Sequence, residues 1–283
     1  MGNQPASEVG SAASSARSSK RFPVITLGST LEFRANQGKE DDMLQFLVMA
    51  RDAVAQTEKE GTQNWYGVRY FPIADLGQKP QPDRFGIVDF FVDEAAQGAH
   101  FSGEVPNAVA ANDQTEDPIV QGGLDAIVAS HRSWRLLTNP PKLTEEKRMK
   151  HAKFLSFIPI RAGSEEQVEA LKELLFGGFL LVSENEKKTS FWAACQNEND
   201  PLEFAIIDTF DSIGGVYAHF VEPALVPSAV QAALVDNPDL IEGGWEIGVV
   251  ANIRVFQIVA SKTDYNAGPS ATKTAKRDCV MCG

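Results

Sequence analysis

Two histidines occupy the same short motif, and histidine is the side chain best suited to proton transfer near neutral pH. Residues 99–101 (AHF) are matched by residues 218–220 (AHF), 119 positions further along the chain. An imidazole with an ordinary pKa of about 6.5 can accept a proton from a phenol. His100 and His219 are therefore candidate catalytic residues. The alternative is a packing or capping role, which shared ancestry of two copies would preserve equally well.

Trp65 and Trp192 occupy matching places in segments that are typical of strands. A large flat ring can wall an aromatic ligand pocket and donate an N–H to an oxygen, although packing in the core is the alternative. The Asn64 amide could hold an oxygen or an enolate. Because consecutive strand residues point to opposite faces, Asn64 and Trp65 reach one pocket only across a bulge. Phe191 replaces Asn64 in the second copy.

Asp89 and Asp208 each share a predicted strand face with large apolar residues. A carboxylate in such a row requires a partner. Each aspartate either orients the histidine or a substrate hydroxyl, or pairs with Arg34 or Arg161 in a structural bridge.

Further pocket candidates are concentrated in the first copy. Tyr66, Arg69 and Tyr70 are replaced in the second copy by smaller or amide side chains, so we expect the first copy to be the more active half. The phenylalanines that follow the histidines, Phe101 and Phe220, complete the expected substrate-binding set.

An internal repeat organises the chain. Residues 85–91 (FGIVDFF) match residues 204–210 (FAIIDTF) at an offset of 119, whereas Trp65 matches Trp192 at an offset of 127. The eight extra residues fall within Phe71–Pro82, whose Pro, Gly and Asp content is typical of an exposed loop.

We therefore expect two domains, 22–138 and 149–261, joined by a linker at 139–148. The segments 1–21 and 262–283 are expected to be disordered tails, since they are too polar to bury enough apolar surface.

Each copy reads as strand, helix, strand, strand, helix, strand, which is the ferredoxin-like β-α-β-β-α-β unit of an α+β fold. The last strands are expected at 126–137 and 247–259. Because apolar residues occupy both faces of the third strand, each sheet needs cover on its second face. We expect the two sheets to pack against each other as an intramolecular pseudo-dimer, and leave open a further homodimer.

Composition excludes several classes of protein. The 283 residues include 43% hydrophobic and 23% charged side chains, as in ordinary globular proteins. A net charge of −12 opposes nucleic-acid binding. The longest apolar patch, residues 174–182, is about half the ~20 residues that span a bilayer. With Cys195 alone in the body of the chain and no secretory signal, we expect a cytoplasmic protein without a transmembrane segment.

No metal is expected. The four histidines lack metal-ligand spacing, and the pair Cys279 and Cys282 cannot by itself complete a tetrahedral zinc site.

The sequence resembles a tandem member of the antibiotic biosynthesis monooxygenase (ABM) family, in the dimeric α/β-barrel superfamily. The resemblance covers both copies: the opening strand, 38–40 (GKE) or 163–165 (GSE) before the first helix, the Trp strand, the Phe-x-Ile-x-Asp-x-Phe strand and the Ala-His-Phe helix. It implies a small-molecule pocket between sheet and helices in each copy. Members are similar to quinol or anthrone oxygenases that use no metal, flavin or haem, and relatives include haem-degrading oxygenases and proteins without known activity.

The resemblance implies a cofactor-independent monooxygenase of secondary metabolism that oxidises a phenolic, quinol or anthrone-like metabolite with O2. His100 or His219 would take or relay the proton, Trp65 or Trp192 would orient the ring, and Asn64 would steady the developing oxyanion. One alternative is a haem-degrading oxygenase, since Asn, Trp and His also recur in those relatives. Another is a non-catalytic protein that holds an aromatic ligand or docks a partner.

Overall fold

A computed structural model describes residues 25–138, 142–143, 151–221 and 225–263. The first half of the chain contains β1 (Leu27–Arg34), α1 (Glu40–Thr57), β2 (Thr62–Tyr70), the 3-10 turn η1 (Ala74–Leu76), β3 (Arg84–Phe91), α2 (Glu94–Phe101), α3 (Glu104–Asp113), α4 (Gly123–Ser130) and β4 (Arg132–Leu136).

The second half repeats this order. After a two-residue strand, β5 (Lys142–Leu143), come β6 (Phe154–Arg161), η2 (Glu165–Gln167), α6 (Val168–Asn185), β7 (Thr189–Asn197), β8 (Glu203–Phe210), α7 (Ile213–Phe220), α8 (Leu225–Asp236), the π-helix η3 (Gly244–Val249), η4 (Val250–Asn252) and β9 (Arg254–Thr263).

The long helices form where apolar residues recur every three or four positions. In α1 the buried side chains are Met43, Leu47, Ala50 and Val54, which place one apolar stripe against the sheet. The shorter α2 begins at Asp93, whose side chain accepts a hydrogen bond from the Ala96 amide at 2.8 Å and so satisfies one unpaired N–H of the first turn.

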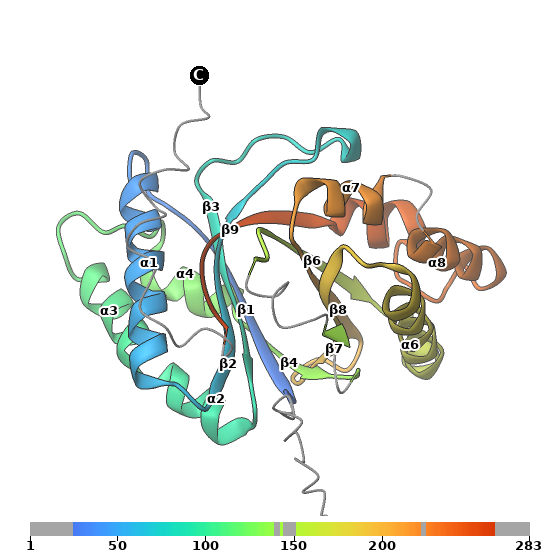
Figure 1. Cartoon of the computed structure of the whole chain (residues 1–283), viewed down its shortest axis with the longest axis horizontal. Coiled ribbons are helices and arrows are strands. Elements are labelled where there is room, and N and C mark those ends of the chain that lie inside the picture. Colours follow the sequence, from blue (N-terminus) through green and yellow to red (C-terminus); the bar gives the residue numbers. More distant parts are fainter. Residues whose placement is uncertain (1–24, 139–141, 144–150, 222–224, 264–283) are drawn as a thin grey trace, which may run out of the picture.

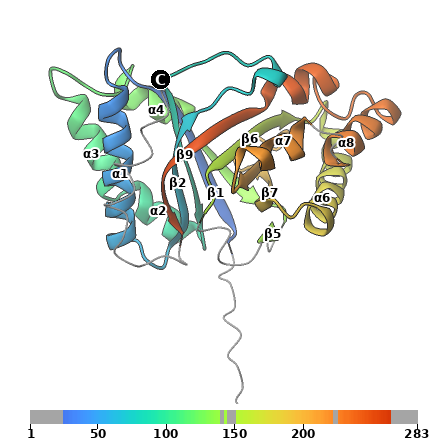
Figure 2. The same cartoon turned by 45° about the horizontal axis from the view of Figure 1, so that its top comes forward.

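Eight of the described strands close into an antiparallel barrel in the order β4-β1-β3-β2-β9-β6-β8-β7, because β7 returns to pair with β4. The last strand of each half joins the two halves: β4 pairs with β1 and with β7, and β9 pairs with β6 and with β2. The helices of the first half cover one side of the barrel, and α6, α7 and α8 cover the opposite side (Figures 1 and 2). The expected α+β class is confirmed.

Three packed clusters form the core. One fills the barrel interior with side chains from both halves, including Tyr66, Phe90, Trp134, Phe191 and Phe256. The other two lie between the barrel wall and the helices of each half. Strand residues therefore alternate between the interior cluster and a helix-facing cluster, and this alternation decides which side chains can share a site.

Some sequence expectations were wrong. The last strands begin later than predicted, since 123–130 is helical in the first half and 244–252 is helical in the second. These short apolar runs fit a helix or a strand equally well by pattern. The segment expected to be a linker contributes β5 at 142–143, and β9 continues to Thr263, into the segment expected to be a tail.

The segment 1–21 and the rest of the expected C-terminal tail lie outside the described residues. Among the helices that are described, none combines the length and apolar character needed to cross a membrane.

Candidate functional site

Each predicted histidine lies between two carboxyl groups. In α2, His100 Nδ1 is 2.6 Å from Glu58 Oε2, at the end of α1, and His100 Nε2 is 3.1 Å from Asp89 Oδ2, on β3. In α7, His219 Nδ1 is 2.5 Å from Glu186 Oε2 and His219 Nε2 is 3.6 Å from Asp208 Oδ2. The aspartates therefore pair with the histidines, rather than with the arginines that were the alternative.

Hydroxyl groups complete both arrangements in the same way. Thr62 donates to Glu58 at 2.5 Å and Ser29 donates to Asp89. The second half repeats this, with Thr189 donating to Glu186 at 2.7 Å and Ser156 donating to Asp208 at 2.8 Å. We call these two sets of side chains the His–carboxyl networks.

The surroundings of His100 hold it in the charged form. Burial opposes the charge, but the Coulomb interaction with Asp89 and the hydrogen bonds to Asp89 and Glu58 outweigh it, raising the pKa of His100 to about 10. Burial likewise opposes the charge of Glu58, yet hydrogen bonds from His100 and Thr62 lower the pKa of that carboxyl group. At neutral pH both ring nitrogens of His100 are protonated, and they face the carboxyl groups of Glu58 and Asp89. The role of base expected for His100 does not suit this environment.

An apolar cavity of about 480 Å³ lies beside His100, between the barrel wall and the helices of the first half. Its size and lining suit a small aromatic molecule. It is lined by Leu31, Phe33 and Ile87 from the strands, Phe46 from α1, His100 and Phe101 from α2, Val105, Pro106, Asn107, Val109 and Ala110 from α3, and Val120, Leu124, Ile127, Val128 and His131 in and around α4.

A second histidine, His131, lines the same cavity. It lies between α4 and β4, is partly buried, and packs edge-on against Phe101 with 4.7 Å between ring centroids. Its Nε2 atom is buried and has no hydrogen-bond partner among the described residues. Burial lowers the pKa of His131, and the charge of Arg132 lowers it further against the opposing effect of Asp89, so this imidazole is neutral at pH 7.

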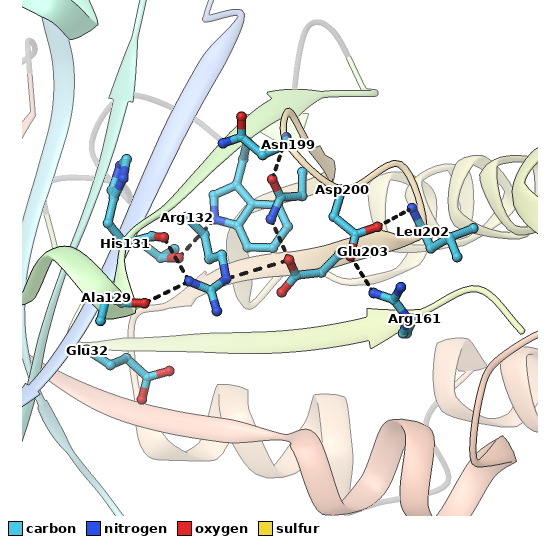
Figure 3. Close-up of polar contacts among 12 residues, drawn as sticks. Glu32, Ala129, His131, Arg132, Arg161, Asn199, Asp200, Leu202 and Glu203 are labelled. Atoms are coloured by element: carbon cyan, nitrogen blue, oxygen red, sulfur yellow. Dashed lines mark hydrogen bonds and ion pairs between the residues drawn. The ribbon is translucent and has the colours of Figure 1, made fainter. Parts of the chain in front are cut away.

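Arg132 anchors the backbone around His131. Its Nη1 donates to the carbonyls of His131 at 2.9 Å and Ala129 at 3.1 Å, and its Nε lies 3.6 Å from Glu203 Oε2. Glu203 begins β8, so this contact joins the two halves. Figure 3 shows the guanidinium between the two carbonyls and Glu203, with the His131 ring directed away from it.

Several predicted site residues lie elsewhere. Asn64 pairs with Phe90 and, like Tyr66, is on the strand face that points into the barrel, opposite to His100. The bulge in β2 precedes Asn64, so it does not turn Asn64 and Trp65 to one side. Neither Asn64 nor Tyr66 therefore lines the cavity.

The tryptophans and Arg69 are also outside the cavity lining. Trp65 is fully buried in the cluster beneath α1, and Trp192 has the same place beneath α6. Arg69 lies over the Phe85 ring and donates to the Pro82 carbonyl at 3.1 Å. Of the predicted residues, His100, Asp89 and Phe101 are at or beside the first cavity, whereas His219, Asp208 and Phe220 form the corresponding group in the second half.

The corresponding region of the second half carries larger side chains. Trp245 corresponds to Leu124, because each follows a pair of glycines. Ile253 corresponds to His131, because each directly precedes the last strand of its half. Both pack into the apolar cluster beneath α6 and α8. His131 was missed because the sequence comparison selected residues present in both copies, and His131 is present in one.

The insertion at 71–82 also packs on the second half. Ile73 is 1% exposed and belongs to the second-half cluster, and the rings of Phe71 and Phe154 are 5.1 Å apart. Gln78 donates through its side-chain amide to the Ile253 carbonyl at 2.8 Å. In Figures 1 and 2 this loop, with η1, reaches across to α7.

Cofactor binding is limited by the side chains present. Among the described residues, no group of three or more His, Cys, Asp and Glu side chains is arranged to hold a metal ion. The cavity lining contains neither Lys nor Arg to pair with the two propionates of a haem, so the residues present do not fit that group.

Comparisons with known proteins identify the fold. No family model matches the sequence, and no curated protein matches it. A protein from Fusobacterium nucleatum, provisionally named a monooxygenase, aligns with a TM-score of 0.60 and 13% identity over 84% of this chain and 94% of its own.

Two further solved structures are similar. A provisionally named monooxygenase from Lactobacillus acidophilus gives a TM-score of 0.54 and 9% identity over 86% of this chain and 97% of its own. An anthrone oxidase-like protein gives 0.53 and 10%, over 88% and 100%. At these identities the likeness establishes a shared fold.

Proposed function

We propose that this protein is a cofactor-independent oxygenase that binds a flat phenolic, quinol or anthrone-like metabolite in the first-half cavity and oxidises it with O2. The observation that carries the proposal is the cavity itself: about 480 Å³, lined mainly by apolar side chains, with two imidazoles in its wall. Such a site favours an aromatic ring and offers polar groups for a hydroxyl.

The proposed reaction converts a para C–H of a phenol, or the methylene of an anthrone, into a carbonyl. A base removes the hydroxyl proton, and the anion gives one electron to O2. The resulting superoxide and substrate radical combine to form a C–O bond, and protonation gives a hydroperoxide. Loss of the remaining C–H proton breaks the O–O bond and releases water. One oxygen atom enters the product, the other leaves as water, and the substrate loses four electrons.

His100 cannot supply the base in this scheme, because its carboxylate partners keep it protonated. Its proposed role is to hold α2 against β3 and the end of α1, so that the next residue, Phe101, contacts the ring of the substrate.

For the architecture, we propose a tandem of two ferredoxin-like domains, 22–138 and 149–261, that form an intramolecular pseudo-dimer of the ABM type. The matching element order, the pairing of β4 and β9 with strands of both halves and the two His–carboxyl networks support this proposal. Only the first domain carries the proposed active site.

Oxygen uptake tests the function. Metal-free protein is mixed with a panel of anthrones, quinols and polyphenols, and O2 consumption is followed together with the mass of the products. The expected result is one O2 consumed for each product that has gained one oxygen and lost two hydrogens, above a heat-killed control. Saturable binding without uptake by any compound would overturn the proposal and support the non-catalytic binding protein.

A further inference from the structure

We propose that His131 is the base of the first-half cavity, the group that accepts the hydroxyl proton of the bound aromatic molecule. This inference rests on the proposed function and names the residue that the reaction requires. No repeated motif marks His131, and its counterpart in the second half, Ile253, cannot accept a proton.

Geometry is the first support. His131 lines the cavity, and its buried Nε2 has no hydrogen-bond partner in the described part of the chain. An unsatisfied buried nitrogen costs free energy unless a bound group pairs with it. The hydroxyl of an aromatic ligand is the group that this apolar cavity would bring to it.

The charges around His131 are the second support. The charged groups that act on it are Asp89 on β3 and Arg132, which is adjacent in sequence, and the protonated His100 lines the same cavity from α2. The remaining cavity wall, from α1, α3 and α4, carries no ionisable side chain. The two imidazoles therefore differ in protonation state: His100 is held charged by its carboxyl partners, whereas His131 is neutral and can accept a proton.

A contact with the second half holds the backbone around His131 in place. Arg132 binds the carbonyls on either side of Ser130 and faces Glu203 across the boundary between halves (Figure 3). Ser130 also accepts the Glu32 backbone amide at 3.1 Å through its hydroxyl oxygen. Arg132 and Glu203 are positioning residues, because they hold the backbone of His131 without lining the cavity.

The test uses 2-hydroxyanthraquinone, a flat phenol that absorbs at longer wavelength when ionised, and anthraquinone, which lacks the hydroxyl. The absorption of the bound phenol is titrated with pH in the full-length wild type, in His131→Gln, and in His151→Gln, a matched control at an exposed histidine. We expect His131→Gln to raise the apparent pKa of the bound phenol by about one unit or more, a tenfold loss of anion. The control should match the wild type, and anthraquinone should bind all three proteins equally.

With a substrate found by oxygen uptake, His131→Gln should lower kcat about a hundredfold or more. An unchanged titration of the bound phenol in His131→Gln would overturn the assignment of His131 and leave the proposed function standing. If neither compound binds the wild type, the proposed function fails together with this inference. Should His131→Gln not fold, Arg132→Gln is expected to shift the titration in the same direction, and an unshifted titration there would count against the proposal.

Discussion

The two halves of the barrel carry the same His–carboxyl network but different surroundings. In the first half the network borders a cavity with a second histidine, whereas in the second half large apolar side chains pack around it. Because the network is the same in both surroundings, its basic role is structural: it ties the ends of two helices and a barrel strand together. Function is expected from what the halves do not share.

The difference arises from a few local changes. Trp245 and Ile253 stand where the first half has Leu124 and His131, and the insertion 71–82 packs against the second-half cluster. The second half also has one more residue between its glycine pair and its last strand, and it accommodates this residue as a π-helix.

The largest expected effect comes from breaking the networks. Asp89→Ala and Asp208→Ala should each reduce the free energy of unfolding by about 3–5 kcal/mol, because each removes one of the two carboxyl partners of a buried histidine. Urea denaturation measures this loss. A large loss for Asp89→Ala together with a negligible loss for Asp208→Ala would show that the networks are not structural equivalents.

Exchanging one residue between the halves should remove the ligand site. Leu124→Trp places the large side chain of the second half in the cavity wall and should weaken binding of 2-hydroxyanthraquinone about tenfold or more, or about 1.4 kcal/mol. The reciprocal change, Trp245→Leu, is the matched control and should leave the dissociation constant unchanged. Equal weakening by both changes would place the ligand elsewhere.

The raised pKa of His100 predicts how stability depends on pH. Since its folded pKa of about 10 exceeds the ordinary 6.5, the stabilisation is complete below about pH 6.5 and is lost as the pH rises toward 10. The gap in unfolding free energy between wild type and His100→Gln should therefore be widest near pH 6 and shrink toward pH 10. A gap that stays constant over this range would contradict the charged state of His100.

The smallest effect is expected from the Arg132–Glu203 ion pair, which joins the two halves. Glu203→Gln removes the charge facing Arg132, and because this pair is partly exposed and 3.6 Å apart, its loss should cost about 1 kcal/mol or less. We expect a shift of a few tenths of a pH unit in the titration of the bound phenol, in the same direction as in His131→Gln. A shift in the opposite direction would show that Arg132 does not hold His131 in place.

The sequence was a good guide to what the fold repeats. The helical spacing of Met43, Leu47, Ala50 and Val54 located α1, and the paired aspartates and histidines proved to be partners in space. It was a poor guide where local patterns are ambiguous. The apolar pattern of the run 123–130 fits a strand as well as a helix. In the structure Gly122 and Gly123 adopt left-handed backbone, which forms a turn, and a helix follows it.

The site was harder to predict because repetition was the main signal. Repetition selected Trp65 and Trp192, which pack in the core, and passed over His131, which occurs once. The polar residues Asn64 and Tyr66 of β2 do not line the cavity, since both face the barrel interior. Which face a strand residue occupies depends on pairing with distant strands, and the position of His131 depends on contacts with Phe101 and Glu203.

The most direct test of the central claim is the number of aromatic molecules that one chain binds. Isothermal titration calorimetry of the wild type with 2-hydroxyanthraquinone should give one molecule per chain, because only the first half has the cavity lined by His131. Two molecules per chain would mean that both halves carry a site, and no binding would mean that neither does. Either result would contradict the account.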